Sequence, residues 1–197
     1  SIIGGSFISG TFYPNVWTVE KIEAEVHKKE LNQVKLLGLR EPEFEYTDKT
    51  SFLLATSKCV EYLNYTTDRL SRVPTSIIIA MAGVESGWGT SRFANEGNAL
   101  FGVRTWDLKN VAHMKAKGNP DASWGVKKYK TKCQSVHDMI KILNRHPAYK
   151  EFRIEREKQM DSGKWNYRTL MVLMNAWSTN PDYHEIILQA IVDNKLP

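Results

Sequence analysis

One glutamate in this sequence stands where a carboxylic acid could do chemistry. Glu85 follows an apolar stretch, residues 77–84, and a glycine-rich break with Gly87 and Gly89 comes directly after it. Apolar side chains recur at helical spacing before Glu85, so we expect it on the face that meets the core or a cleft. Apolar surroundings and the negative end of the helix dipole both raise the pKa of such a carboxyl. A carboxyl that keeps its proton near neutral pH is what a general acid requires.

The alternative is that Glu85 is an ordinary surface residue near the end of a helix. Glutamate is rarely buried without a partner, so most glutamates in such a position are solvated. The apolar face that carries Glu85, with Trp88 and two glycines beside it, favours a functional role.

The residues from 85 to 103 resemble a known family of enzymes. Glu-Ser-Gly-Trp-Gly-Thr-Ser-Arg-Phe-Ala starts at Glu85, and Gly-Asn-Ala-Leu-Phe-Gly-Val starts at Gly97. Both are similar to the glucosaminidases of the flagellar and autolysin type, especially those of the Bax-like branch. Two later segments match in the same order, residues 126–136 and residues 177–183, and the resemblance runs from about residue 50 to the C-terminus. It implies an endo-β-N-acetylglucosaminidase that cuts the bond between N-acetylglucosamine and N-acetylmuramic acid in peptidoglycan, with Glu85 as the catalytic acid.

The resemblance also implies roles for aromatic residues of a substrate cleft. Tyr129 matches a family tyrosine that points towards the catalytic centre; its alternative is a strand residue packed on the helices. Trp177 and Tyr183 lie where the family closes the cleft. The family residue at position 177 is usually tyrosine, so Trp177 keeps an aromatic wall but lacks the hydroxyl.

Three further residues are candidates for substrate binding. Trp88 offers an indole face on which a pyranose could pack, although a core position suits it at least as well. Asn98 and Phe101 match the Asn-x-x-Phe-Gly segment of the family. We expect Asn98 to secure the turn and Phe101 to join the core.

The second catalytic group is harder to find. Cleavage of a glycosidic bond normally uses two carboxylates, but no glutamate lies between Glu96 and Glu151. The expected β lobe offers only Asp107 and Asp121, and Asp121 stands in a turn beside a proline, where aspartate is common for structural reasons. Asp121 stays a catalytic candidate. We favour a substrate-assisted route through the sugar's own N-acetyl group, or a water held by polar groups such as Tyr129, since neither needs a second carboxylate.

These residues need a helical domain and a small lobe to position them. Between residues 100 and 130 apolar side chains alternate with polar ones, which predicts an antiparallel hairpin or three-stranded lobe in preference to a long irregular loop. The fold class is therefore α+β and mainly α: a lysozyme-like helical domain with a small antiparallel β lobe. Ser135 and Asn180 are the expected N-caps of two of the helices. The helices are expected over residues 50–64, from near 74 to 86, from 135 onwards, and over 148–160, 166–176 and 181–194.

We divide the chain into two parts at residue 47. Residues 1–47 are expected to form an N-terminal arm, with a helix capped by Thr18 and a linker from residue 38, and residues 48–197 the catalytic domain. The first ten residues lack the basic start and the apolar core of a signal peptide. We expect the protein in the cell envelope, periplasmic or secreted, or in a phage particle.

Charge and composition exclude several classes of protein. The net charge of +5 suits an acidic polymer such as the cell wall. Nucleic acid is equally compatible on charge alone, but the sequence has no RNA-binding aromatic signature, no zinc-finger spacing and no concentrated basic tract, so no nucleic-acid partner is expected. The longest apolar stretch, residues 77–84, is far too short to span a membrane.

The cysteines and histidines indicate no cofactor. Cys59 and Cys133 could form one disulfide or remain two buried thiols. His184 and Glu185 lack the second histidine of a zinc protease motif. We expect a monomer with no metal and no organic cofactor, acting on the glycan strands of peptidoglycan.

Two other functions remain open at this point. A lytic transglycosylase also uses one glutamate after a core helix, but its usual Gly-Leu-Met-Gln segment is absent here. A wall-binding or virion component could keep the fold without turnover, although the intact segment at Glu85 argues against it.

Overall fold

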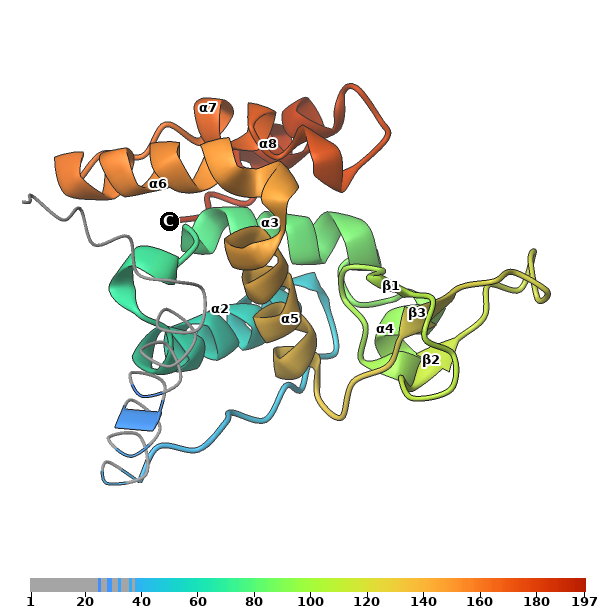
Figure 1. Ribbon diagram of the computed structural model, residues 1–197. Helices are drawn as coiled ribbons and strands as arrows, with labels where there is room; N and C mark the ends of the chain where they lie inside the picture. The colour runs from blue at the N-terminus through green and yellow to red at the C-terminus, as the bar shows by residue number, and fades with distance from the viewer. Residues whose placement is uncertain (1–24, 26–27, 30–31, 33–35, 37) are drawn as a thin grey trace, which may run out of the picture.

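The sequence places its most apolar helix at the centre of the molecule. In the computed structural model, which describes residues 25, 28–29, 32, 36 and 38–197, α3 (Thr75–Ser86) has nine of its twelve residues buried. A helix that is apolar on all sides needs neighbours on all sides. Figure 1 shows α6, α7 and α8 on one side of α3 and α2 and α5 on the other. Gly87 ends α3 with a positive φ of 59°, and its N–H bonds back to the carbonyl of Gly83.

Two helices that cover α3 are joined covalently. α2 (Lys49–Thr66) begins with a capping box between Asp48 and Ser51, and it packs on α3 and on α5 (Lys132–Arg145). A disulfide between Cys59 of α2 and Cys133 of α5 decides between the alternatives that the sequence left open.

Two expected N-caps were wrong. α5 begins after Thr131, whose side chain accepts from the N–H of Gln134, and Ser135 is instead buried, with its hydroxyl accepting from Leu100 N. The last helix begins after Asp182, while the Asn180 side chain caps the preceding turn by accepting from Asp182 N. Thr131 thus caps the free N–H groups of α5, whereas α8 begins without a side-chain cap from Asp182 because the Asn180 side chain bonds in the turn before it.

The C-terminal helices form the second layer over α3. Short 3₁₀ turns link them, and the segment expected as one helix over 166–176 is divided into α7 and η3. Their bounds are η2 (Pro147–Tyr149), α6 (Lys150–Ser162), α7 (Tyr167–Val172), η3 (Asn175–Trp177) and α8 (Tyr183–Asp193); a further 3₁₀ turn, η1 (Arg69–Ser71), lies between α2 and α3.

A small β lobe projects from one end of this helical body (Figure 1). It follows α4 (Arg92–Gly97) and consists of β1 (Arg104–Thr105), β2 (His113–Met114) and β3 (Gly125–Lys127). The strands are antiparallel in the order β1-β3-β2, with Arg104 opposite Val126 and Met114 opposite Val126 on the other side. The predicted mainly helical α+β fold with an antiparallel lobe is confirmed.

Of the N-terminal part predicted for residues 1–47, only the segment from residue 38 onwards can be compared with the structure in detail. The arm over residues 1–17 and the helix capped by Thr18 fall outside the described residues. Residues 39–46 form no helix or strand, as expected for a linker, but Phe44 and Tyr46 pack against the core. The Tyr46 hydroxyl donates to the carbonyl of Gly89, so this segment braces the break after α3.

No helix within the described residues is long and apolar enough to cross a membrane.

Candidate active site

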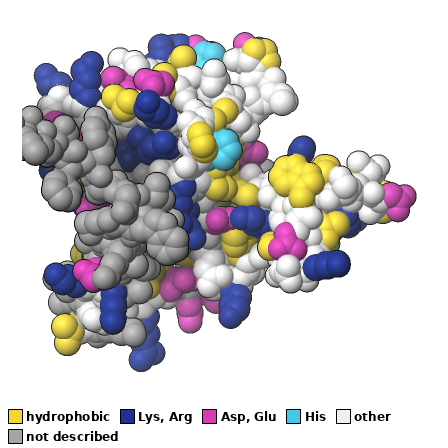
Figure 2. Space-filling view, viewed as in Figure 1, with side chains coloured by type: hydrophobic (Ala, Val, Ile, Leu, Met, Phe, Trp, Pro, Cys, Tyr) yellow, Lys and Arg dark blue, Asp and Glu magenta, His cyan; other side chains and the backbone are white. Residues whose placement is uncertain are grey.

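An open pocket lies where the helical body meets the β lobe. Its volume is about 540 Å³, and Figure 2 shows apolar side chains exposed along this boundary. The end of α3, the start of β1, the end of α5 and the segment from η3 onwards all contribute to it. Its lining residues are Glu85, Phe101, Gly102, Val103, Arg104, Trp106, Ile142, His146, Tyr149, Ala176, Trp177, Ser178 and Thr179.

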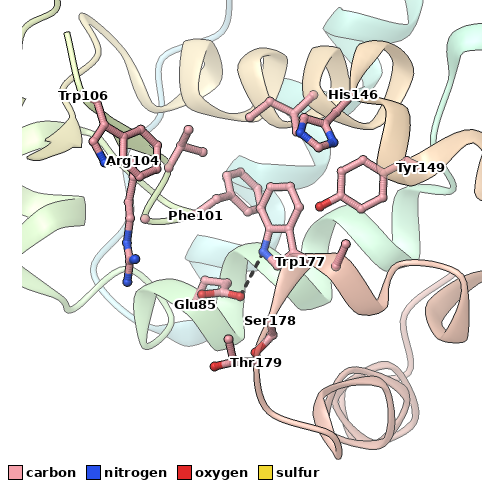
Figure 3. A pocket seen from close by; sticks show the side chains of 13 residues that line it. Glu85, Phe101, Arg104, Trp106, His146, Tyr149, Trp177, Ser178 and Thr179 are labelled. Carbon is pink, nitrogen blue, oxygen red and sulfur yellow. Dashed lines mark hydrogen bonds between the residues drawn. The ribbon is translucent and has the colours of Figure 1, made fainter. Parts of the chain in front are cut away.

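Glu85 projects into this pocket from the last turn of α3 (Figure 3). Its side chain reaches water through the mouth of the pocket, while the rings of Phe101 and Trp177 line the space beside it. This partial loss of hydration raises the pKa of Glu85, and the nearby Tyr183 hydroxyl and the Trp177 N–H oppose the rise. Desolvation was one of the two causes expected from the sequence. The result is a carboxyl with the environment of a general acid.

Trp177 contacts the carboxyl of Glu85 directly. The indole Nε1–H donates to Glu85 Oε1 over 3.2 Å (Figure 3), although the two residues are 92 positions apart. The ring is held edge-on to Phe101, with 6.3 Å between centroids, and lies 6.4 Å from Tyr149. Trp177 lacks the hydroxyl of the tyrosine that is usual at this position in the family. Its indole N–H supplies a hydrogen-bond donor to Glu85 instead.

Tyr183 stands behind Glu85 and does not line the pocket. It is the first residue of α8, its ring is 8% exposed, and its hydroxyl is buried. Within the described residues that hydroxyl has no partner in hydrogen-bond geometry, yet it is close enough to Glu85 for each group to shift the other's pKa. Burial, followed by the charge of Glu85, raises the pKa of Tyr183. The structure thus brings together Glu85, Trp177, Tyr183 and Phe101.

Two residues predicted to bind substrate, Trp88 and Asn98, lie outside the pocket. The Trp88 ring covers Gly83, where a Cβ would come within 2.2 Å of the indole, and Lys49 Nζ lies 4.0 Å from the ring centroid. Trp88 is a packing residue and does not line the pocket. Asn98 ends α4 with a φ of 52°, and its amide donates to the carbonyls of Tyr129 and Lys130, so it secures the turn as expected.

Tyr129 does not point towards Glu85 as the resemblance implied. Its hydroxyl donates to Asp138 Oδ2 of α5 over 2.8 Å, and Lys127 Nζ lies 2.9 Å from the same oxygen. Burial, with the nearby Asp138 charge, raises the pKa of Tyr129. Tyr129 ties β3 to α5 and does not line the pocket. The alternative, a strand aromatic packed on the helices, is the better description.

Neither aspartate of the lobe reaches the pocket. Asp121 is exposed in the loop between β2 and β3, as its turn sequence suggested. The Asp107 carboxylate accepts from the backbone and side chain of Asn110, and these bonds lower its pKa. Among the described residues that line the pocket, Glu85 is the one carboxylate. No second carboxylate within the described part of the chain shares this pocket with Glu85.

Several pocket residues were missed in the sequence. Arg104 and Trp106 stand on the lobe side, and His146 and Tyr149 on the helical side (Figure 3). For the lobe pair no local pattern was available, since Arg104 starts a two-residue strand and Trp106 lies in the bend after it. His146 and Tyr149 flank the short turn that begins at Pro147, and no local pattern in the sequence shows that such residues line a cleft.

No group of three or more histidine, cysteine or acidic residues within the described part of the chain is placed to hold a metal ion.

A single carboxylic acid at the end of a buried helix, facing a cleft between a helical body and a β lobe, defines a lysozyme-like glycoside hydrolase. The sequence profile of the glucosaminidase family, described as mannosyl-glycoprotein endo-β-N-acetylglucosaminidase, matches residues 65–196. The chain belongs to this family, and the resemblance seen in the sequence is confirmed.

Two relatives show the extent of the similarity. Over 132 residues the chain is 30% identical to Protein bax of Escherichia coli strain K12, a match that covers 65% of this chain and 45% of that protein. The chain thus spans about half the length of this curated relative. The fold is similar to the catalytic domain of the autolysin Auto from Listeria monocytogenes, with a TM-score of 0.54 and 19% identity over 85% of this chain and 94% of that one.

Proposed function

We propose that this chain is an endo-β-N-acetylglucosaminidase that hydrolyses the β-1,4 bond from N-acetylglucosamine to N-acetylmuramic acid in peptidoglycan. Membership of the glucosaminidase family and the fold shared with an autolysin support a peptidoglycan substrate. The observation that carries the proposal is Glu85, a carboxyl with a raised pKa that projects into an open pocket between the helical body and the β lobe.

Glu85 acts as the general acid in this proposal. Its protonated carboxyl gives a proton to the glycosidic oxygen as the bond from that oxygen to C1 of N-acetylglucosamine breaks. The N–H of Trp177 and the hydroxyl of Tyr183 stabilise the carboxylate that remains. Opposing effects on the pKa of Glu85, from desolvation on one side and these donors on the other, keep the acid able both to lose its proton and to regain it.

The second catalytic group comes from the substrate. As the leaving sugar departs, the carbonyl oxygen of the N-acetyl group on the same N-acetylglucosamine attacks C1 and forms a cyclic oxazolinium ion. A water then adds to C1, reopens the ring, and returns a proton to Glu85. Support for this route is the absence of a second carboxylate from the described residues that line the pocket. The buried Tyr183 hydroxyl is a further candidate to hold the N-acetyl group or the water.

The cell envelope is the compartment that this function requires. The disulfide between Cys59 and Cys133 supports it, because such bonds persist in oxidising compartments. Both relatives are bacterial proteins and give no support to a phage particle. A monomeric state and a domain boundary near residue 47 remain predictions.

The product of digestion tests the proposal. Purified peptidoglycan would be digested with the wild-type protein and with Glu85→Gln, and the fragments analysed by mass spectrometry before and after borohydride reduction. We expect reducing-end N-acetylglucosamine from the wild type and none from the variant. Anhydro-N-acetylmuramic ends would instead identify a lytic transglycosylase, which the single-acid arrangement also suits. Binding without cleavage by either protein would indicate a wall-binding role.

A further inference from the structure

The lobe side of the pocket presents two side chains, one from β1 and one from the bend that follows it. Arg104 is the first residue of β1, Trp106 comes directly after the strand, and the residue between them, Thr105, is buried. Both Arg104 and Trp106 line the pocket. Figure 3 shows them on one side of Glu85, with Trp177, His146 and Tyr149 on the other.

Arg104 is a cation without a carboxylate partner. Among the described residues no salt bridge joins it to an acidic side chain. Its guanidinium carbon lies 4.1 Å from the ring centroid of Trp124, which holds the group in place and leaves its N–H donors free. A guanidinium fixed by stacking is well suited to bind an incoming carboxylate through two hydrogen bonds.

Trp106 is 66% exposed, whereas tryptophan side chains are highly buried on average. Its ring offers a flat apolar face at the mouth of the pocket (Figure 3). A sugar ring has apolar C–H faces that pack on such a surface, and its equatorial hydroxyls stay in water.

We propose that Arg104 and Trp106 form a subsite for a sugar residue that carries a carboxylate, on the leaving-group side of the scissile bond. This rests on the proposed function and adds a reason for its choice of bond in glycan whose N-acetylmuramic acid bears no peptide stem, because a stem converts the lactyl carboxylate into an amide. In such a polymer of alternating neutral and acidic amino sugars, Trp106 packs on either sugar, whereas Arg104 pairs only with the acidic one. Seating the N-acetylmuramic acid here places the neutral N-acetylglucosamine on the other side of Glu85, so only one of the two alternating bonds meets the acid.

Calorimetric binding to two stem-free tetrasaccharides tests the subsite. One alternates N-acetylglucosamine with N-acetylmuramic acid, and the other contains N-acetylglucosamine alone; Glu85→Gln is the background, so that neither is cleaved. We expect Arg104→Gln to weaken binding of the acidic ligand about tenfold and to change binding of the neutral ligand less than twofold. Arg104→Lys should recover part of the loss. Trp106→Ala should weaken both ligands.

Two matched variants serve as controls. Arg69→Gln removes an exposed arginine of η1, beyond the opposite end of α3, and Trp165→Ala removes a partly exposed tryptophan that does not line the pocket. Neither should change the affinity for either ligand. Methyl esterification of the acidic ligand should remove the preference without any change to the protein.

The outcomes separate this inference from the proposed function. If Arg104→Gln weakens both ligands equally, or neither, while the wild type cleaves peptidoglycan to reducing-end N-acetylglucosamine, the subsite is overturned and the function stands. If the wild type neither cleaves peptidoglycan nor binds either tetrasaccharide, both fall together.

Discussion

The two walls of the pocket are built in different ways. On the helical wall, Glu85, Trp177 and Tyr183 come from the ends of α3, η3 and α8, and each touches or influences another. On the lobe wall, Arg104 comes from the two-residue strand β1 and Trp106 from the bend after it, and both are exposed. The helical wall is anchored in the core, whereas on the lobe wall Arg104 stacks on Trp124 and Trp106 is 66% exposed.

This difference separates chemistry from recognition. A general acid must keep one geometry and one shifted pKa, which needs neighbours fixed by packing on rigid elements. A sugar polymer has to enter, slide and leave, so its subsites suit exposed side chains on a small lobe. The carboxylates show the division most clearly, since Glu85 lines the pocket on the helical wall and Asp107 and Asp121 of the lobe do not line it.

The largest expected effect comes from the acid itself. Glu85→Gln removes the transferable proton and keeps the shape of the side chain, so turnover of peptidoglycan should fall about a thousandfold. Release of reducing ends measures the loss. Asp107→Asn and Asp121→Asn are the matched controls on the lobe and should retain at least half of the wild-type rate. Abolished turnover in either folded aspartate variant would overturn the substrate-assisted route and return the second carboxylate to the lobe.

The next effect is on the stability of the helical wall. The disulfide joins α2 to α5 across a separation of 74 residues, so its removal frees a long loop in the unfolded chain. Replacing Cys59 and Cys133 by alanine should lower the free energy of unfolding by about 2–4 kcal/mol. Urea denaturation measures this, and the wild type in reductant should lose a similar amount. The folded double variant should keep its turnover at 25 °C, because neither sulfur lines the pocket; an unchanged urea midpoint would show that the bond does not form.

Much of the helical wall could be predicted from local pattern. The apolar spacing before Glu85 and the glycines after it defined the end of α3, and alternation over 100–130 indicated the lobe. The helix starts were harder, because Thr131 and Ser135 can each cap a helix. A tertiary contact decides between them: the Ser135 hydroxyl is buried and accepts from Leu100 N.

The site could be predicted from local sequence only for Glu85, whose neighbouring residues indicate its position. The bond from Trp177 to Glu85 joins residues 92 positions apart, and no periodicity reports such a contact. The orientation expected for Tyr129 was wrong for the same reason. Its hydroxyl donates to Asp138 on the following helix, and Tyr129 does not line the pocket. Arg104 and Trp106 were missed because their neighbours in the sequence do not show that these side chains line a pocket.

Removal of the Tyr183 hydroxyl should separate function from stability. Tyr183→Phe deletes a donor that lowers the pKa of Glu85, so the alkaline limb of the kcat/KM profile should move to higher pH while turnover falls about tenfold. The hydroxyl is buried without a partner in hydrogen-bond geometry, so its deletion should leave the Tm unchanged or raise it. Loss of activity together with a lowered Tm would instead assign Tyr183 a structural role.

Trp177 offers a smaller and more selective test. Trp177→Phe keeps an aromatic ring against Phe101 but removes the N–H that bonds to Glu85 Oε1. We expect kcat/KM to fall about fivefold and the alkaline limb to move to higher pH, because that bond lowers the pKa of Glu85. Trp177→Tyr restores a donor and should recover much of the activity. Equal profiles for the phenylalanine and tyrosine variants would show that only the ring matters.

The smallest effect is on the free energy of unfolding, which the ionised carboxyl of Glu85 lowers. Burial raises the pKa of Glu85 in the folded protein above its ordinary value of 4.5, so the folded state binds more protons than the unfolded state between the two pKa values. Stability therefore falls as the pH rises through that window and is fully present below it. Glutamine carries no charge, so Glu85→Gln should gain stability relative to the wild type at about pH 8 and show no such gain at about pH 3.

The gain should stay below about 1 kcal/mol, because Glu85 remains in contact with water at the mouth of the pocket. Thermal unfolding of both proteins across this pH range measures it. Glu96→Gln, at an exposed glutamate of α4 paired with Arg92, controls for the loss of one negative charge. If the wild type instead gains stability over Glu85→Gln as the pH rises, the donors Trp177 and Tyr183 outweigh desolvation. Glu85 would then be ionised near neutral pH, and the helical wall would hold a base where this proposal requires an acid.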